Sequence, residues 1–195
     1  MSNKDSNISD IYVTLLHYPV VNRAGNVIIS AITNLDIHDI SRACKTYGIK
    51  NFFIVTPDKE QQEISKEIIS YWIKGKGGEL NPDRKEALKL VKIKSDLSSV
   101  KNEIFKKTDD LPLVIATSAG YKGQVISCRK LKENFLFNKE NKRPLLLVFG
   151  TAFGLHKDIY NNEVDMVLES IKGPTAYNHL SVRCAVAIYL DRLLN

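Results

Sequence analysis

Short apolar runs alternate along the chain with longer segments whose apolar residues recur at helical spacing. The clearest helical segment is 35–47, which has apolar residues every three or four positions from Ile40 and a candidate left-handed C-cap at Gly48. Buried strands that alternate with helices predict an α/β fold with flanking helices on a mostly parallel sheet. The predicted strands are residues 11–16, 51–55, 90–93, 113–116, 145–149 and 164–168. The predicted helices are residues 35–47, 56–73, a short one from 83, 96–107 and 178–194.

Local signals fix some of these boundaries. Thr56 is the predicted N-cap of the second helix, Pro57 its first helical residue and Asp58 a carboxylate at the positive end of its dipole. The glycine-rich stretch 75–78 is expected to break the helical pattern, and residues 17–26 are expected to form a loop.

The last predicted helix is apolar on almost every side between residues 184 and 190 (CAVAIYL). Packing against a single sheet cannot bury such a helix, so it needs a second apolar surface. Because this helix lies at the end of the chain, we expect that second surface to be a homodimer interface.

The composition is that of an ordinary globular protein. Apolar residues make up 44% and charged residues 26% of the 195 positions, which excludes a disordered or collagen-like chain. No apolar run approaches the roughly 18 residues of a membrane span, and residues 1–10, expected to be flexible, lack a signal-peptide core. Three scattered cysteines without a CxxC pair predict reduced thiols. We therefore expect a cytoplasmic protein, without membrane contact, whose residues 1–195 form a single domain.

Positive charge is concentrated in two segments. Residues 74–107 hold ten basic and five acidic residues, and residues 120–143 hold seven basic and two acidic, so each segment carries +5 in a chain whose net charge is +6. This concentration favours an anionic partner, of which nucleic acid is the commonest. Two solvated lysine-rich faces are the alternative interpretation.

The familiar catalytic and nucleotide-binding motifs are absent from the sequence. There is no GxxxxGK[ST] phosphate loop and no GxGxxG after the first strand. No clustered His or carboxylate pattern suggests a metal, and no GxSxG suggests a serine nucleophile. The four histidines are dispersed, and each is interpreted as a structural residue.

Three turns rich in small residues instead follow predicted strands, at residues 116–120, 150–155 and 171–178. Ligands of open α/β sheets bind beyond the carboxyl ends of the strands. Small residues let backbone groups approach a ligand as closely as an adenine edge requires. One such turn could simply reverse the chain, but three together predict a binding site.

These turns resemble those of a known family. The runs LLLVFGTAFGL (145–155) and LESIKGPTAYNHLSVRCAVAIYLDRLL (168–194) resemble the cofactor-binding half of the SPOUT RNA methyltransferases. In that family a G-[ST]-x-x-G-L turn and an N-x-S-V-type helix start flank S-adenosylmethionine. Residues 33–57 are similar to the N-x-x-N-x-G-x-x-x-R motif of its ribose methyltransferases. The resemblance covers residues 12–194 and is greatest to the small bacterial stand-alone SPOUT proteins.

The resemblance implies a C-terminal deep trefoil knot, which general topology rules would exclude because knots are rare. It also implies an obligate homodimer and an RNA substrate, a tRNA or rRNA methylated at a ribose 2′-oxygen or at guanine N1. The implied cofactor is S-adenosylmethionine, converted to S-adenosylhomocysteine, with no metal. The residues carried over for cofactor binding are Thr117, Ser118, Ala119, Phe149, Gly150, Thr151, Gly154, Ile171, Gly173, Leu180 and Ser181.

Three residues are carried over for catalysis. Arg42 falls where the ribose methyltransferases have the arginine that helps to deprotonate or orient the target hydroxyl, and Arg23 and Asn178 are candidates for substrate contact. A surface ion pair is the alternative role for Arg42. If the target is a base nitrogen, Asp36 or Asp39 could act as general base, although both could instead stabilise a helix N-terminus.

The sequence departs from the family pattern at several positions. Ala152 stands where the ribose methyltransferases usually have a glutamate, and Asp36 and His38 replace the Asn and Gly of the N-terminal motif. His179 occupies the place of the final asparagine, with Asn178 just before it. These departures bear on the methylated atom more than on the cofactor. The alternative function is a non-catalytic RNA- or nucleotide-binding module that keeps the knot.

Overall fold

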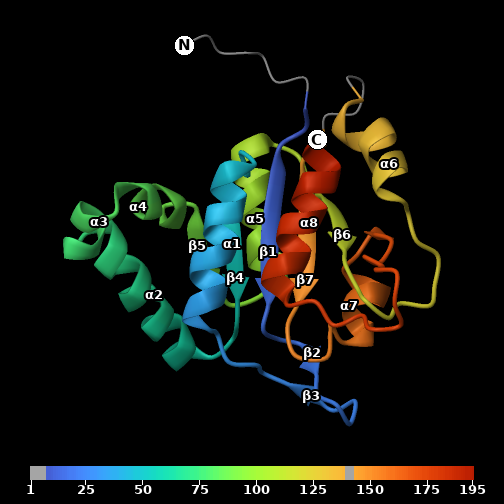
Figure 1. Cartoon of the computed structure of the whole chain (residues 1–195), viewed down its shortest axis with the longest axis horizontal. Helices are drawn as coiled ribbons and strands as arrows, with labels where there is room; N and C mark the ends of the chain where they lie inside the picture. The colour runs from blue at the N-terminus through green and yellow to red at the C-terminus, as the bar shows by residue number, and fades with distance from the viewer. Residues whose placement is uncertain (1–7, 139–142) are drawn as a thin grey trace.

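A six-stranded parallel sheet forms the centre of the fold in the residues that the computed structural model describes, 8–138 and 143–195 (Figure 1). The strand order is β5-β4-β1-β7-β6-β8, and every neighbouring pair is parallel. The predicted α/β fold on a mostly parallel sheet is therefore confirmed. Its strands are β1 (Ile11–Leu16), β4 (Phe52–Val55), β5 (Val91–Lys94), β6 (Leu113–Ala116), β7 (Leu145–Gly150) and β8 (Met166–Val167).

Helices cover both faces of the sheet, which explains why its central strands are apolar throughout. All of β1 and all but the last residue of β7 are buried. Side chains of α1, α2, α4, α6 and α8 build the core on one face, and those of α5 and α7 build it on the other. The helices are α1 (Asn34–Thr46), α2 (Lys59–Ile73), α3 (Lys76–Leu80), α4 (Pro82–Leu88), α5 (Leu97–Thr108), α6 (Cys128–Leu131), the π-helical η1 (Lys132–Leu136), α7 (Lys157–Asn162) and α8 (Val182–Leu194).

The start of α2 differs from the prediction. Asp58, not Thr56, is the N-cap, because its carboxylate accepts hydrogen bonds from the N–H groups of Glu60 and Gln61 at 2.9 and 3.2 Å. The Thr56 hydroxyl accepts from the Asp58 N–H at 3.3 Å instead, so the helix begins after Pro57. A carboxylate that satisfies two amides is a stronger cap than a hydroxyl that satisfies one.

The glycine-rich stretch 75–78 ends α2 but does not remain irregular, because α3 begins within it. Gly77 is buried where no side chain would fit: a Cβ there would lie 2.6 Å from Cε1 of Tyr71 and 2.8 Å from Cε3 of Trp72. The glycines therefore let α3 pack closely against the last turn of α2.

The last helix also begins later than predicted, at Val182, because Ser181 is its N-cap and the Ser181 hydroxyl accepts from the Cys184 N–H at 3.2 Å. The helix packs against α1, α6 and β7. Ala187 and Ile188 stay half-buried within the chain, so the predicted homodimer contact remains a prediction. The buried residues of α8 are Val186, Tyr189, Leu190 and Leu193.

Short elements were not predicted. The expected loop 17–26 contains β2 (Val20–Val21), which pairs with β3 (Val27–Ile28) in a hairpin, and α6, η1 and α7 also went unpredicted. Each of these elements is too short to show a period of its own. Of the expected flexible segment 1–10, residues 1–7 lie outside the described residues, whereas Ser9 is buried and donates to the Leu136 carbonyl at 3.0 Å. No helix among the described residues is long and apolar enough to span a membrane.

Candidate functional site

The three small-residue turns follow neighbouring strands at one end of the sheet, since β6 lies between β7 and β8 (Figure 1). After β6, the N–H and hydroxyl of Thr117 both donate to the Val148 carbonyl, at 2.9 and 3.2 Å. Ile126 then pairs with the β8 side, through its N–H to the Val167 carbonyl and its carbonyl to the Glu169 N–H, both at 2.9 Å. The loop after β6 is thus anchored on both neighbouring strands.

Left-handed backbone at Ala152 and Gly154, with φ of 52° and 114°, shapes the turn 150–155 after β7. This conformation costs an alanine about 1 kcal/mol, whereas glycine adopts it freely. The turn is held by β2, because the Val21 N–H donates to the Gly154 carbonyl and the Phe153 N–H donates to the Val21 carbonyl, both at 3.0 Å.

The segment 170–180 after β8 has an unusual backbone. None of these residues forms a backbone–backbone hydrogen bond with another described residue, and most are exposed. The Asn178 amide donates to the Ala119 carbonyl at 3.5 Å, which brings the segment beside the turn after β6. A hypothetical Cβ on Gly173 would meet no atom within 4 Å. The segment therefore offers free N–H and C=O groups, next to open space, to a ligand or to water.

A series of hydrogen bonds joins the turn after β7 to β1. The Thr151 hydroxyl donates to the Leu16 carbonyl at 3.1 Å and also bonds the Ser30 hydroxyl, which lies 3.1 Å from Nδ1 of His17. The single hydroxyl hydrogen of Thr151 is engaged by the Leu16 carbonyl, so Thr151 must accept from the Ser30 hydroxyl. The Ser30 oxygen in turn accepts a hydrogen bond from Nδ1 of His17. Burial lowers the pKa of His17 to about 4 against the opposing effect of Asp36, so the ring is neutral at pH 7 and carries its proton on Nδ1.

We expect this histidine to make folding stability depend on pH. The unfolded chain binds a proton on His17 near pH 6.5, whereas the folded chain does so only near 4. The free energy of unfolding should therefore decrease by up to about 3 kcal/mol as the pH drops from about 6.5 to 4. In urea unfolding at several pH values, His17→Asn, which keeps a donor near Ser30, should lose much of this dependence. The exposed His179→Asn should retain it; equal pH profiles for all three proteins would contradict the assignment.

A buried carboxylate links the starts of α1 and α8. Asp36 accepts from the Thr33 hydroxyl at 2.6 Å and from Nη1 of Arg183 at 3.1 Å, and Nε of Arg183 lies 3.2 Å from Asp39. Thr33 caps the helix by accepting from the Asp36 N–H at 3.1 Å. The Asp36 carboxylate is only 6% exposed and holds Arg183, so it is not available to a substrate. Asp39 is more exposed but shares the same arginine.

Comparison with known proteins identifies the family of the chain. Residues 10–195 match the family described as SAM-dependent RNA methyltransferase, where SAM is S-adenosylmethionine. The chain belongs to this family. The match covers the sheet, the three turns and the last helix together.

Two relatives of this chain differ in length. A protein of Nitratidesulfovibrio vulgaris named tRNA (guanine-N(1)-)-methyltransferase is 39% identical over 187 residues, which are 95% of this chain and 42% of the relative. The chain thus spans less than half the length of that relative. An uncharacterized protein of Aquifex aeolicus is 36% identical over 186 residues, which are 95% of this chain and 89% of the relative.

Solved structures share the fold at low identity. A putative methylase family protein from Neisseria gonorrhoeae gives a TM-score of 0.62 at 18% identity, over 100% of this chain and 85% of that one. The SpoU methyltransferase AviRb from Streptomyces viridochromogenes, solved with AdoMet, gives a TM-score of 0.58 at 13% identity. The match covers 96% of this chain and 57% of that one. The sheet and its flanking helices are therefore those of SPOUT methyltransferases.

The residues assigned to the cofactor by the methyltransferase resemblance all lie in or beside the three turns. Their side chains differ in access, since Thr117 and Phe149 are buried whereas Leu180 is 48% exposed. The Phe149 ring packs against Tyr189, with centroids 6.0 Å apart, so this residue can meet a ligand only through its backbone. The assigned residues are Thr117, Ser118, Ala119, Phe149, Gly150, Thr151, Gly154, Ile171, Gly173, Leu180 and Ser181.

The three residues assigned to catalysis are dispersed. Asn178 lies at the turns through its bond to Ala119. Arg42 is exposed on α1 and Arg23 is exposed between β2 and β3; among the described residues neither side chain forms a hydrogen bond or ion pair with the turns. Arg42 also has no ion-pair partner in residues 8–138 and 143–195, so its predicted alternative role in a surface ion pair finds no support within the chain.

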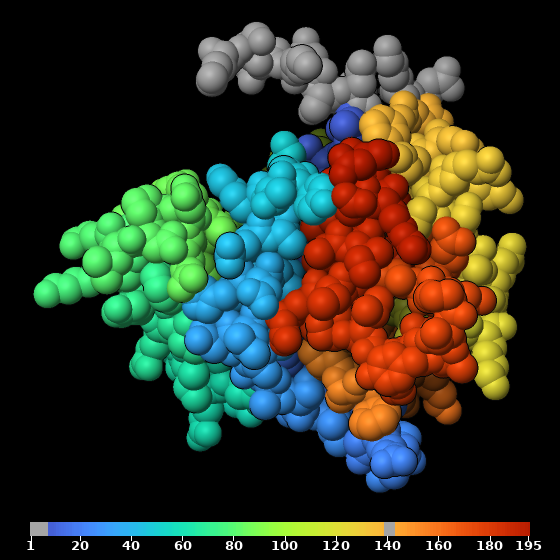
Figure 2. Space-filling model, in the orientation of Figure 1, coloured from blue at the N-terminus to red at the C-terminus, as the bar shows by residue number. Residues whose placement is uncertain are grey.

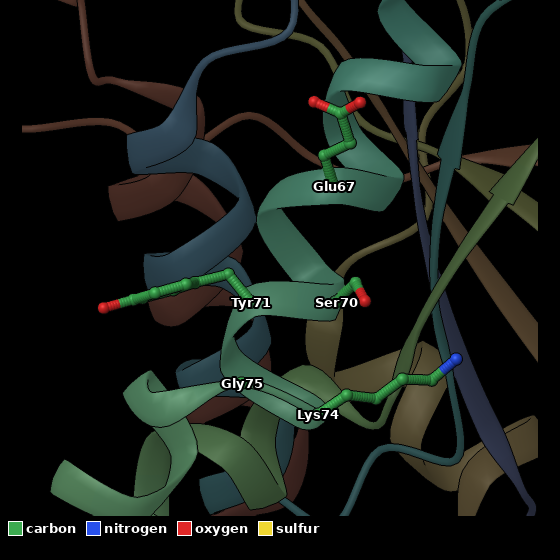
Figure 3. A pocket seen from close by; sticks show the side chains of 5 residues that line it. All are labelled: Glu67, Ser70, Tyr71, Lys74 and Gly75. Atoms are coloured by element: carbon green, nitrogen blue, oxygen red, sulfur yellow. The ribbon is translucent and has the colours of Figure 1, made fainter.

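A hollow on the surface of the described residues lies outside this site. It lies on α2, away from the turns, and is lined by Glu67, Ser70, Tyr71, Lys74 and Gly75. Figure 3 shows Tyr71 and Lys74 pointing to opposite sides of the helix, with Glu67 directed away from both. In the part of the chain that the structure describes, no three His, Cys, Asp or Glu side chains gather as metal ligands would.

Proposed function

We propose that residues 1–195 form one SPOUT-type domain that transfers a methyl group from S-adenosylmethionine to tRNA or rRNA in the cytoplasm. The target atom is a ribose 2′-oxygen or guanine N1, the product S-adenosylhomocysteine is released, and no metal takes part. The C-terminal region forms the trefoil knot of this superfamily. The pairing of Ile126 beside β8 and the Asn178–Ala119 bond support the knot, because both bring the C-terminal segment against the loop after β6.

The observation that carries this proposal is the backbone of segment 170–180, which lacks backbone–backbone hydrogen bonds to other described residues and lies beside two other turns of small residues. Free N–H and C=O groups can bind the edge of an adenine, and open space at Gly173 leaves room for it. The exposed Leu180 provides an apolar surface for the ring. Thr117 and Ser118 lie in the first turn, directly after β6.

S-adenosylmethionine supplies a methyl group on a positively charged sulfur, and the target atom must lose one proton as it is methylated. The chain therefore has to align the target with the methyl group and stabilise the charge that develops as this proton leaves. Arg42 can stabilise a ribose alkoxide or hold a neighbouring phosphate, once RNA is bound along α1. For a guanine target, Asp39 is the more accessible candidate base, because Asp36 is buried against Arg183.

The decisive experiment is transfer of a labelled methyl group from S-adenosylmethionine to unmodified tRNA and rRNA. Digestion to nucleosides and mass spectrometry would then separate 2′-O-methylated products from 1-methylguanosine. Label in either product supports the proposal and names the atom. Binding of both cofactor and RNA without any transfer would identify the chain as a non-catalytic module.

We also predict a homodimer that uses α8. Light scattering at micromolar concentration should give about twice the 22.0 kDa of one chain. Ile188→Glu, on the half-buried side of α8, should shift the protein towards the monomer, because a charge there cannot be buried in an apolar contact. Ile64→Glu on the exposed side of α2 should not. A monomeric wild-type protein would refute the prediction.

A further inference from the structure

The basic residues of the segment 74–107 and of the neighbouring helix α1 form two groups in space. On the α5 side, Lys92, Lys94 and Lys107 all pair with Glu103, at 2.6 Å for Lys94 and 3.2 Å for Lys107. Lys101 pairs with Glu163 at 2.7 Å in the same region. Most of the positive charge on this side is therefore compensated by carboxylates of the chain itself.

The second group lies where α1 and α4 pack together. It comprises Arg42 and Lys45 of α1 with Arg84 and Lys85 of α4, and none of these four has an ion-pair partner within residues 8–138 and 143–195. Two of the nearby acids are already engaged, since Asp39 pairs with Arg183 and Glu86 with Lys89.

The pKa of Glu86 indicates that lysines of α1 and α4 lie near one another. The hydrogen bond from Lys89, followed by the fields of Lys89, Lys45 and Lys85, lowers the pKa of Glu86. The α1–α4 junction, defined here by Arg42, Lys45, Arg84 and Lys85, thus holds uncompensated positive charge.

Aromatic rings border this junction. Trp72 lies between His38 of α1, with ring centroids 5.3 Å apart, and Arg84 of α4, whose guanidinium is 4.6 Å from the Trp72 ring. Tyr71 packs edge-on against Trp72 at 5.3 Å and lies over Gly77, yet 53% of it is exposed. Gly77 and Trp72 therefore pack against the Tyr71 ring while much of its surface stays free. Figure 3 shows the Tyr71 side chain projecting away from α2.

We propose that the α1–α4 junction and Tyr71 form an RNA-binding surface on which an unpaired base stacks on Tyr71 and phosphates contact Lys45 and Lys85. The proposal rests on the proposed function for its RNA substrate. Flat aromatic faces and cations are the combination that binds single-stranded RNA, because bases stack on rings and lysines neutralise phosphates.

This surface is continuous with the predicted methyl-transfer site. In Figure 2, α4 and α1, then α8 and the 170–180 segment, lie in sequence across one face of the molecule. An RNA held at the junction can therefore extend over α1, past Arg42, towards the turns. The compensated lysines lie on the opposite face, with α5.

The test is binding of a short fluorescein-labelled single-stranded RNA, measured by anisotropy at several salt concentrations without cofactor. Tyr71→Leu, which keeps packing on Gly77 but removes the flat ring, should weaken binding about tenfold, and Tyr71→Phe should preserve it. Combined Lys45→Ala and Lys85→Ala should reduce the slope of log affinity against log salt by about 1.4. Phe105→Ala and Lys106→Ala, both exposed on α5, are the matched controls and should change neither quantity.

The outcomes separate this proposal from the proposed function. If the junction variants bind RNA as wild type does, while labelled methyl transfer to RNA still occurs, the surface is wrong and the function stands. If binding changes as expected but no methyl group is transferred, the surface stands and the function is wrong. Equal loss in the α5 controls would also overturn the proposal. Thermal melting of every variant guards against misfolding.

Discussion

Arg42→Ala should lower methyl transfer to RNA by about 100-fold or more, while leaving the affinity for S-adenosylmethionine nearly unchanged. This is the size of effect expected for a positioned proton-transfer group. Arg42 is exposed on α1 and bonds to none of the three turns, so its loss should not disturb the cofactor. Arg42→Lys should be a poor replacement, because an ammonium cannot clamp phosphate or hydroxyl with a planar fork.

The measurement is single-turnover transfer with RNA in excess, so that weakened RNA binding cannot be mistaken for slower chemistry. Calorimetry with S-adenosylmethionine checks the cofactor, and Lys106→Ala on the far face is the charge-matched control. If Arg42→Ala transfers methyl groups at the normal rate under these conditions, the ribose-type mechanism is wrong. Attention would then move to Asp36, Asp39 and Asn178, with Asp36 disfavoured by its burial.

Gly173→Val should abolish measurable binding of S-adenosylmethionine without unfolding the protein. A Cβ at Gly173 would meet no atom of the chain within 4 Å, so a small side chain there would occupy space that we expect the ligand to use. Calorimetry and thermal melting of Gly173→Ala and Gly173→Val should show affinity that decreases with side-chain size at a constant melting temperature. Normal affinity in the folded valine variant would remove Gly173 from the site.

Gly150 provides an instructive contrast. A Cβ there would lie 2.9 Å from the backbone nitrogen of Leu155 and equally close to its side chain. Gly150→Val should therefore lower the melting temperature as well as the affinity, because the turn itself must shift. Loss of binding in that variant alone could not be attributed to contact with the cofactor.

The central strands of the sheet were predictable because a strand that is buried on both faces is a continuous apolar run, as in residues 145–149. The first residues of the helices were harder to predict, because several neighbouring polar residues can each act as the N-cap. Asp58 displaces Thr56 at α2, and Ser181 fixes the start of α8 after the predicted residue 178. Such competition is decided by which oxygen reaches a free amide, and this depends on three-dimensional geometry.

The site was predictable only where it carries a local pattern. The turns after β6, β7 and β8 contain small residues, and strand order places them together. The bonds among His17, Ser30 and Thr151, and the pairing of Arg183 with Asp36, join residues far apart in the sequence that belong to no motif. Likewise, net charge along the segment 74–107 could not reveal that five of its nine lysines form ion pairs with carboxylates of the same chain.

Both edges of the sheet oppose the addition of a strand from another chain. Lys92 and Lys94 lie on the edge strand β5, and lysines on an edge oppose pairing with a foreign strand. At the other edge, β8 has two residues, and Ile126 bridges the chain just beyond them, at Leu168. Neither edge strand has a long row of unpaired backbone N–H and C=O groups to which further chains could add. Self-association of the folded protein is therefore directed to its helical surfaces, even at the high concentrations that favour edge-to-edge stacking.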